Sequence, residues 1–365
     1  MRFVDEYRDP EQVRKLVAAI RTEAPPPMTI MEVCGTHTMA ISRFGLRQLL
    51  PPQIELISGP GCPVCVTPQS DIDAFLSLAG RPDITLVTFG DMLRVPGSRS
   101  SLEVERARGA DVRIVYSPAD ALETARRNGS KETIFFGVGF ETTAPGVALT
   151  LAAAAREGIS NFSVYCAHKL IPPALSALLS GESPAIDGLL LPGHVSTIIG
   201  MRAYEPVARD FGVPCVISGF EPVDILQSVL MLVRQVKESR AEVENEYRRA
   251  VALNGNLAAQ QAMATAFETC DADWRGIGTI PCSGLAIRQE YAQCDARARF
   301  GLAAESHESQ EPEGCLCGEI LRGRSRPPDC PFFASSCTPS EPVGPCMVSS
   351  EGTCAAWYRY GDTVR

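Results

Sequence analysis

The chain lacks the features that would place it in a membrane or on a nucleic acid. No apolar run in its 365 residues reaches the roughly 18 that a membrane-spanning helix needs. The segment before Arg14 is charged throughout, so we expect a cytoplasmic protein without a signal peptide. The net charge is -9 and no long Lys/Arg cluster is present, which argues against binding to nucleic acid.

A nucleotide-binding loop is also poorly supported. No G-x-x-x-x-G-K-[ST] string occurs, and the turn at 137–145 has Gly137 and Gly139 but no third glycine at the expected place. Glu141 in the same turn would repel a phosphate. The remaining composition, 45% hydrophobic and 21% charged, is that of a globular chain long enough for two or three domains.

Cysteine, in contrast, is abundant. In a reducing compartment 14 cysteines argue against a disulfide scaffold, so metal ligation, redox chemistry and simple burial must divide them. Cys166 and Cys215 fall within apolar strand runs, and we interpret them as core thiols. We interpret Cys270, Cys282 and Cys294, which lie apart from the other cysteines, as packing residues.

From about residue 28 to 220 the chain alternates short aliphatic runs, Gly/Pro/Thr-rich turns and amphipathic stretches. This pattern predicts an α/β fold, and continuously apolar runs fit strands that are buried on both faces of parallel sheets. The strand candidates are Thr29 to Val33, Ile54 to Ile57, Ile84 to Phe89, Val112 to Tyr116, Thr133 to Val138, Phe162 to Cys166, Gly188 to Leu191 and Pro214 to Ile217.

The polar turn at 126–130 predicts a boundary that divides these strands into two sheets of about four each. A long helix is expected over Val223 to Ala252, and beyond Cys270 the sequence becomes loop-rich. The predicted organisation is two Rossmann-like parallel-sheet domains, residues 1–127 and 128–252, followed by a loop-rich helical C-terminal domain, residues 253–365.

Three thiols follow strand candidates near the N-terminus. Cys34 opens the string Cys34-Gly35-Thr36-His37-Thr38, and Cys62 and Cys65 stand in Gly59-Pro60-Gly61-Cys62-Pro63-Val64-Cys65. Parallel strands bring their carboxyl ends to one edge of a sheet, so we expect these thiols to lie close together. A helix start at Thr67-Pro68, after a loop that holds both cysteines of the pair, would favour their thiolate forms.

The histidines leave alternatives open. His37 either hydrogen-bonds a thiolate or binds iron, or it is a polar residue satisfied in the first turn of a helix. His168 and His194 each end a candidate strand, and we interpret them as structural. The turns at 89–97, 137–145 and 191–194 have the same Gly/Pro character and are expected to line a shared cleft.

Six cysteines gather between Gly314 and Ala355, in a segment with few large apolar residues. Such a segment needs another source of order, and thiolate-rich sites select iron-sulfur clusters or zinc. The wide, irregular gaps favour a four-cysteine iron-sulfur cluster over zinc, with free or disulfide-bonded cysteines as a third possibility. Two of the six thiols are surplus to any four-thiolate site, which leaves room for a redox-active pair beside it.

Four strings in this order resemble the HypD family of hydrogenase maturation factors. They are the Cys34 string, the Cys62/Cys65 string, Gly139-Phe140-Glu141-Thr142-Thr143-Ala144-Pro145, and Cys346-Met347-Val348-Ser349-Ser350-Glu351-Gly352-Thr353-Cys354. The resemblance implies a scaffold on which the Fe(CN)2CO group of nickel-iron hydrogenases is assembled. It further implies that the protein forms a complex with a HypC-type chaperone and receives cyanide ligands from a HypE-type donor. Outside that complex the protein is expected to be a monomer.

The family pattern C-x14-C-x6-C-x16-C for a [4Fe-4S] cluster falls on Cys315, Cys330, Cys337 and Cys354. By the same resemblance Cys317 and Cys346 form a redox-active dithiol between the cluster and the Cys62/Cys65 pair. Cys34 would hold the iron, which carries cyanide and carbon monoxide, together with a cysteine of the chaperone. Cys62 and Cys65 would handle electrons or exchange disulfides nearby.

Two other functions remain open at this point. The first is a thiol-disulfide oxidoreductase that uses Cys62 and Cys65 on an external substrate. The predicted later helix start argues against this function, because thioredoxin-type motifs begin their helix at the first cysteine. The second is a partner-binding module whose C-terminal metal only holds the fold.

Overall fold

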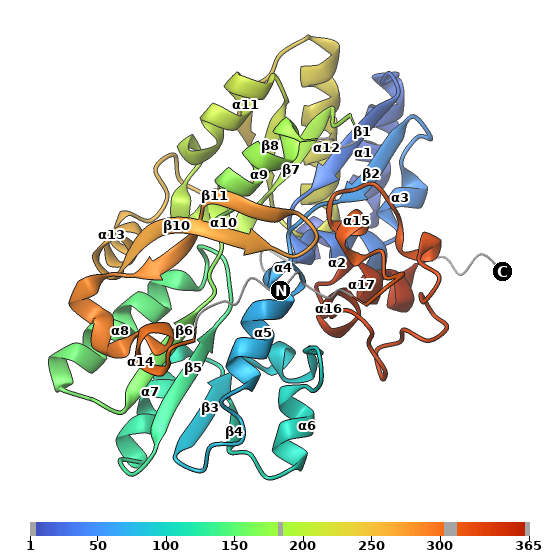
Figure 1. Ribbon diagram of the computed structural model, residues 1–365. Helices are drawn as coiled ribbons and strands as arrows, with labels where there is room; N and C mark the ends of the chain where they lie inside the picture. Colours follow the sequence, from blue (N-terminus) through green and yellow to red (C-terminus); the bar gives the residue numbers. More distant parts are fainter. Residues whose placement is uncertain (1–4, 182–184, 303–311, 362–365) are drawn as a thin grey trace.

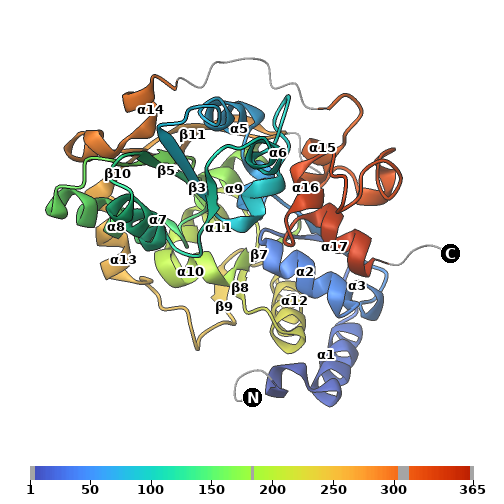
Figure 2. The same ribbon diagram turned by 90° about the horizontal axis from the view of Figure 1, so that it is seen from below.

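The computed structural model describes residues 5–181, 185–302 and 312–361. Two parallel sheets flanked by helices form an α/β body, and an antiparallel hairpin crosses between the sheets (Figure 1). The loop-rich C-terminal region packs at one side, beside α2 and α3 (Figure 2). The predicted fold class is confirmed.

The larger sheet has five strands, all parallel. In spatial order they are β2 (Ile54–Ser58), β1 (Met28–Glu32), β7 (Gly188–Pro192), β8 (Cys215–Ser218) and β9 (Val243–Asn245). Glu55 is exposed, which fits the edge position of β2, whereas β7 is buried throughout and occupies the centre.

The smaller sheet has four parallel strands. They are β4 (Val112–Ile114), β3 (Ile84–Thr88), β5 (Glu132–Gly137) and β6 (Phe162–Cys166). The predicted division of strands near residue 127 is wrong, because β1 and β2 belong to the same sheet as β7 and β8, through the pairing of β1 with β7, and not to the sheet of β3 and β4. The two sheets therefore interleave along the chain.

Alternate strand residues supply two packing faces. One face of the larger sheet packs on α1, α2, α3 and α12, and one face of the smaller sheet packs on α7 and α8. The remaining faces meet in a shared core with α5, α9 and α11. The helices named here are α1 (Pro10–Thr22), α2 (Gly35–Arg43), α3 (Leu46–Leu49), α5 (Gln69–Leu76), α7 (Pro118–Arg127), α8 (Ala144–Glu157), α9 (Ile171–Ser180), α11 (Glu205–Phe211) and α12 (Pro222–Lys237).

The predicted helix over Val223 to Ala252 is too long. Helix α12 ends at Lys237 because Ser239 adopts a left-handed backbone with φ of 52°, and β9 follows. No helix within the described residues is long and apolar enough to cross a membrane.

Sequence reasoning also missed a hairpin beyond α13 (Leu257–Ala266). It consists of β10 (Phe267–Trp274) and β11 (Gly278–Ile287), where loops were expected. The other helices are α4 (Pro63–Val66), α6 (Leu102–Ala107), α10 (Gly193–Ile199), α14 (Ala296–Phe300), α15 (Cys317–Leu321), α16 (Pro345–Val348) and α17 (Thr353–Tyr360).

Candidate functional site

Cys34 and the Cys62/Cys65 string lie at the same edge of the larger sheet, as predicted. They follow the paired strands β1 and β2, and the Gly35 N–H donates to the Gly61 carbonyl at 3.0 Å. A Cβ atom on Gly61 would stand 2.2 Å from the backbone nitrogen of Cys34. Glycine at position 61 is therefore required by the close approach of the two loops.

We expect Gly61→Ala to destabilise the protein by roughly 1–3 kcal/mol, because the added methyl group must push the Cys34 backbone aside. Urea unfolding measures the loss. Gly80→Ala is the matched control, since a Cβ atom there meets nothing within 4 Å. Equal stability of the two variants would contradict the close approach.

Cys34 is a buried thiol at the start of α2. Burial raises its pKa to about 12, the charge of Glu351 adds to the rise, and backbone N–H groups at the start of α2 act in the opposite direction. A thiol in this environment stays protonated until a cation takes the place of its proton. Cys34 is thus suited to hold a metal ion rather than to attack a substrate unaided.

Glu32 supports Cys34 from within the sheet. One carboxylate oxygen accepts a hydrogen bond from the Cys34 N–H at 3.1 Å, and the other accepts one from the Thr38 hydroxyl. Burial raises the pKa of Glu32 to about 7. Glu32 therefore fixes the turn that carries Cys34, a role that its place in an apolar strand did not reveal.

His37 lies fully buried one turn into α2. Its Nε2 donates to the Gly219 carbonyl at 2.8 Å, which places the ring proton on Nε2. Burial lowers the pKa of His37 to about 4, so the ring is neutral. Its Nδ1 has no hydrogen-bond partner among the described residues. This nitrogen therefore has a lone pair that no described group engages, which argues against a His37 whose two ring nitrogens are both satisfied.

The turn at 219–222 connects His37 with His194. The ring of Phe220 lies 4.8 Å from that of His37 and 4.0 Å from that of His194, centroid to centroid. Burial lowers the pKa of His194, so it too favours the neutral form. His168, in contrast, packs against Gly137, where an added Cβ atom would stand 3.0 Å from its ring.

Cys62 and Cys65 form a disulfide in this structure. Cys62 is the N-cap of α4, Pro63 occupies its first position, and the Cys65 N–H lies 3.2 Å from Cys62 Sγ. The predicted helix start near Thr67-Pro68 is present, since α5 begins at Gln69 with Pro68 as its N-cap. The predicted loop setting of the two cysteines is wrong, because the short helix α4 already begins beyond Cys62. Proline is favoured at the first helical position, and here it begins a separate turn of helix at the first cysteine.

The C-terminal region covers the turn that carries Cys34. The Thr36 hydroxyl donates to Glu351 at 2.6 Å, and a Cβ atom on Gly35 would stand 2.4 Å from Glu351 Cβ. The Ser349 hydroxyl donates to Asp91 at 3.2 Å, so the turn at 89–97 reaches the same region. Glu351 was not predicted as a site residue, because its contact joins positions 315 residues apart.

All six C-terminal cysteines line one small cavity. Besides Cys315, Cys317, Cys330, Cys337, Cys346 and Cys354, its walls are Ile320, Phe333, Gly344 and Met347. Within the described residues no group of three or more His, Cys, Asp or Glu side chains is arranged to hold a single metal ion. A cluster that binds each thiolate through a different iron needs more widely spaced thiolates than a single ion does. The six cysteines of this cavity supply the donor chemistry for such a cluster.

Cys317 and Cys346 form a close sulfur contact within the group of six cysteines. Their sulfur atoms are 2.8 Å from each other, closer than separate thiols normally pack but beyond the length of a disulfide bond. Burial raises the pKa of Cys354, and that of Cys315 to about 12. The short Cys317–Cys346 contact is compatible with the expected redox pair, and the assignment of the other four thiols to a cluster stays a prediction.

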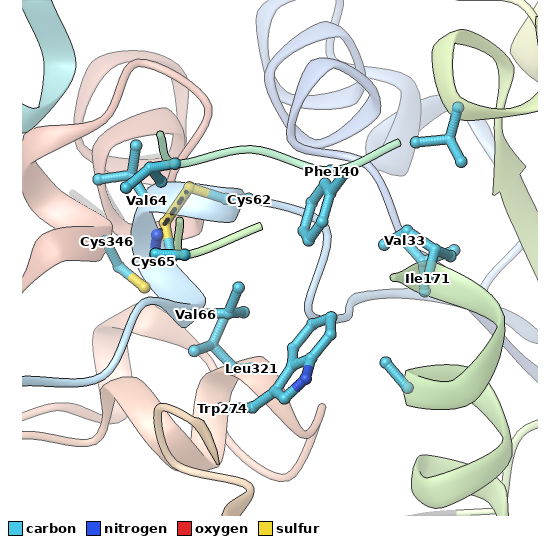
Figure 3. Packing of buried hydrophobic residues seen from close by; sticks show 14 of the residues in the cluster. Val33, Cys62, Val64, Cys65, Val66, Phe140, Ile171, Trp274, Leu321 and Cys346 are labelled. Carbon is cyan, nitrogen blue, oxygen red and sulfur yellow. Dashed lines mark hydrogen bonds between the residues drawn. A yellow bond between two sulfur atoms is a disulfide. The ribbon is translucent and has the colours of Figure 1, made fainter. Parts of the chain in front are cut away.

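Cys346 lies beside the Cys62–Cys65 disulfide (Figure 3). Helix α16, which carries Cys346, packs against α4, and all three cysteines belong to one buried core. Phe140 and Trp274 stack with ring centroids 6.0 Å apart and lie on the other side of α4 (Figure 3). The route from the C-terminal cavity to the disulfide therefore runs through packed side chains.

The turn at 137–145 also reaches the site. Burial raises the pKa of Glu141 to about 7, and one of its oxygens accepts the Ile171 N–H at 2.9 Å. Burial raises the pKa of Tyr204, and the charges of Glu141 and Cys34 add to that rise. Tyr204 therefore lies near both Glu141 and Cys34. A cleft shared by the three turns stays a prediction.

The other cysteines behave in different ways. Cys166 and Cys215 are buried core thiols, and Cys294 packs as expected. Cys270 is half-buried, and Cys282 is exposed in a hairpin bulge with φ of 52°. The interpretation of Cys282 as a packing residue is therefore wrong, because the bulge turns its side chain to the surface.

Together, the fold and the site define a two-sheet α/β protein whose cysteine-rich C-terminal region packs against the turn that carries Cys34 and against α4, which carries the disulfide. The family model HypD, described as "Hydrogenase formation hypA family", matches residues 11–361. The chain belongs to the HypD family.

Three relatives are similar over 99% of this chain. The hydrogenase maturation factors HypD of Azotobacter vinelandii and Escherichia coli are 50% and 49% identical to it, over 97% and 98% of their own lengths. HypD of Rhodobacter capsulatus is 48% identical over 98% of its length.

Proposed function

We propose that this protein acts in hydrogenase maturation as a scaffold on which an Fe(CN)2CO group is assembled. The supporting observation is that one segment joins all the thiols. Residues 346–354 begin at Cys346 beside the disulfide, place Glu351 against the Cys34 turn and end at Cys354 in the C-terminal cavity. The relatives' names agree with this role, since they are maturation factors.

Cys34 is the proposed thiolate ligand of the iron, which is cargo rather than a resident cofactor. When a ferrous ion binds, its charge displaces the thiol proton, and the buried setting then strengthens the metal-thiolate interaction. His37 offers the Nδ1 lone pair in the same neighbourhood, either to the iron or to a proton released during assembly. Soft thiolate suits an electron-rich ferrous centre that carries cyanide and carbon monoxide.

Cys315, Cys330, Cys337 and Cys354 are the proposed ligands of a [4Fe-4S] cluster. A bound cluster supplies single electrons and holds together a segment with little apolar surface of its own. The apolar wall formed by Ile320, Phe333 and Met347 would keep water away from it.

The Cys317/Cys346 pair is the proposed link to α4. In thiol-disulfide exchange, a Cys317/Cys346 dithiol transfers two electrons and two protons to the Cys62–Cys65 disulfide, so one S–S bond forms as the other breaks. The reduced Cys62/Cys65 pair is then the proposed electron source for the iron on Cys34. We further propose that the protein works in the cytoplasm as a monomer that joins a HypC-type chaperone and a HypE-type cyanide donor.

A thiol-disulfide oxidoreductase is the alternative, and the helix start at Cys62 removes one argument against it. Burial argues against it instead, because Cys62 and Cys65 are only 4% and 0% exposed. An external disulfide cannot reach thiols that are packed in a core.

Turnover of a generic disulfide substrate separates the two functions. If the protein is a scaffold, we expect wild type, Cys62→Ser and Cys34→Ser all to turn over the disulfide near the uncatalysed rate. Both variants should nevertheless lose hydrogenase maturation. Fast turnover that Cys62→Ser abolishes and Cys34→Ser retains would favour the oxidoreductase.

A further inference from the structure

The tip of the β10–β11 hairpin is hydrogen-bonded to the end of α4, the helical turn that carries the disulfide. The Arg275 backbone N–H donates to the Val66 carbonyl at 2.9 Å, and its Nε donates to the Thr67 carbonyl at 3.0 Å. These carbonyls close α4 at the end opposite Cys62. Arg275 thus offsets the negative end of that helical turn.

The guanidinium of Arg275 is a buried charge without a carboxylate partner. It is part of a residue that is only 4% exposed, and both of its terminal nitrogens donate to the neutral side-chain carbonyl of Gln69 at 3.2 Å. No ion pair of Arg275 occurs among the residues described in this structure. An unpaired buried charge is costly, so a chain that keeps one benefits from an anion nearby.

The disulfide supplies such an anion only when it is reduced. Reduction breaks the S–S bond of Cys62 and Cys65 with two electrons and two protons, and release of one of these protons leaves one thiol and one thiolate. The thiolate forms on the single helical turn α4, whose other end Arg275 contacts at the Thr67 carbonyl, and charges in such a buried setting interact more strongly than in water. The cation therefore favours the reduced state.

We propose that Arg275 is a positioning residue that sets the reduction potential of the Cys62–Cys65 pair. It stabilises the thiolate across α4 and holds the end of that turn in place. The same hairpin tip lies against α15, because a Cβ atom on Gly276 would stand 2.2 Å from Gly318 Cα, next to Cys317. This inference rests on the proposed redox role of Cys62 and Cys65.

An anaerobic titration of the full-length protein against oxidised and reduced dithiothreitol tests the proposal. Rapid alkylation and mass spectrometry of the peptide with Cys62 and Cys65 give the oxidised fraction. We expect Arg275→Met to shift the equilibrium about tenfold toward the disulfide, which is about 30 mV for a two-electron couple. Arg275→Lys, which keeps the charge, should stay within about twofold of wild type.

Two further variants separate the effect of the Arg275 charge from the effect of its hydrogen bonds. Arg275→Gln removes the charge and keeps an amide donor, so it should reproduce the tenfold shift even if Arg275→Met fails to fold. Gln69→Leu removes both hydrogen bonds to Arg275 and one to the Pro96 carbonyl but keeps the charge, so it should leave the potential within about twofold.

Equal potentials in wild type and Arg275→Gln, or a tenfold shift in Gln69→Leu, would overturn the role of Arg275. A wild-type pair that no dithiothreitol ratio reduces or reoxidises would instead contradict the redox part of the proposed function. The two failures are therefore distinguishable.

Discussion

Replacing Cys34 with alanine should reduce hydrogenase maturation by more than about 100-fold, because loss of a residue that only supports a metal ligand already costs 10- to 100-fold. The variant should fold and keep its C-terminal cluster, since Cys34 does not line that cavity. Hydrogenase activity in a strain without its own HypD-type factor measures the loss. The iron content of the purified variant shows whether the cluster is kept, and its thermal unfolding shows whether the variant is folded.

Cys215→Ala is the matched control for Cys34→Ala. Both residues are buried thiols on the larger sheet's chain segments, but Cys215 begins β8, whereas Cys34 follows the carboxyl end of β1. We expect Cys215→Ala to keep most of its maturation activity. Full activity of Cys34→Ala would favour the partner-binding module over the scaffold.

Replacing Cys330 with alanine should remove the cluster. Wild-type protein purified without oxygen should be brown and contain about four iron and four labile sulfide per chain, and Cys330→Ala should contain almost none. We expect the variant to lose more than about 4 kcal/mol of stability, because the C-terminal segment depends on the metal centre for order. Iron and sulfide analysis and chemical unfolding measure both effects.

Cys294→Ala controls for the loss of a buried thiol. Cys294 is fully buried but lies outside the six-cysteine cavity, so its variant should keep the cluster and lose little stability. A colourless wild-type protein that contains only zinc would contradict the cluster assignment, as would unchanged iron in Cys330→Ala.

Local sequence patterns predicted the parallel strands because each is a short apolar run between turn residues. The strand partners could not be predicted in the same way. Leu189, Leu190 and Leu191 are all fully buried, which requires a central place in a sheet, but nothing local shows that β1 is the neighbour. The hairpin was missed because β10 alternates exposed polar residues instead of forming an apolar run.

The thiols of the site were predictable and their surroundings were not. Cysteines at strand ends are visible in the sequence, as are the two excess thiols of the C-terminal segment. Glu32 lies within an apolar strand, Glu351 reaches Thr36 across the whole chain, and Arg275 meets Thr67 from a hairpin that was not expected. Such contacts arise from packing between distant segments, which local patterns do not encode.

Infrared spectroscopy of the protein purified anaerobically with its HypC-type partner tests the central claim most directly. Cyanide and carbon monoxide bound to iron absorb in a region free of protein bands. We expect stretching bands of both ligands in wild type and in Cys215→Ala, and none in Cys34→Ala. Wild-type protein without such bands, or bands of equal strength in Cys34→Ala, would contradict assembly of the iron group on Cys34.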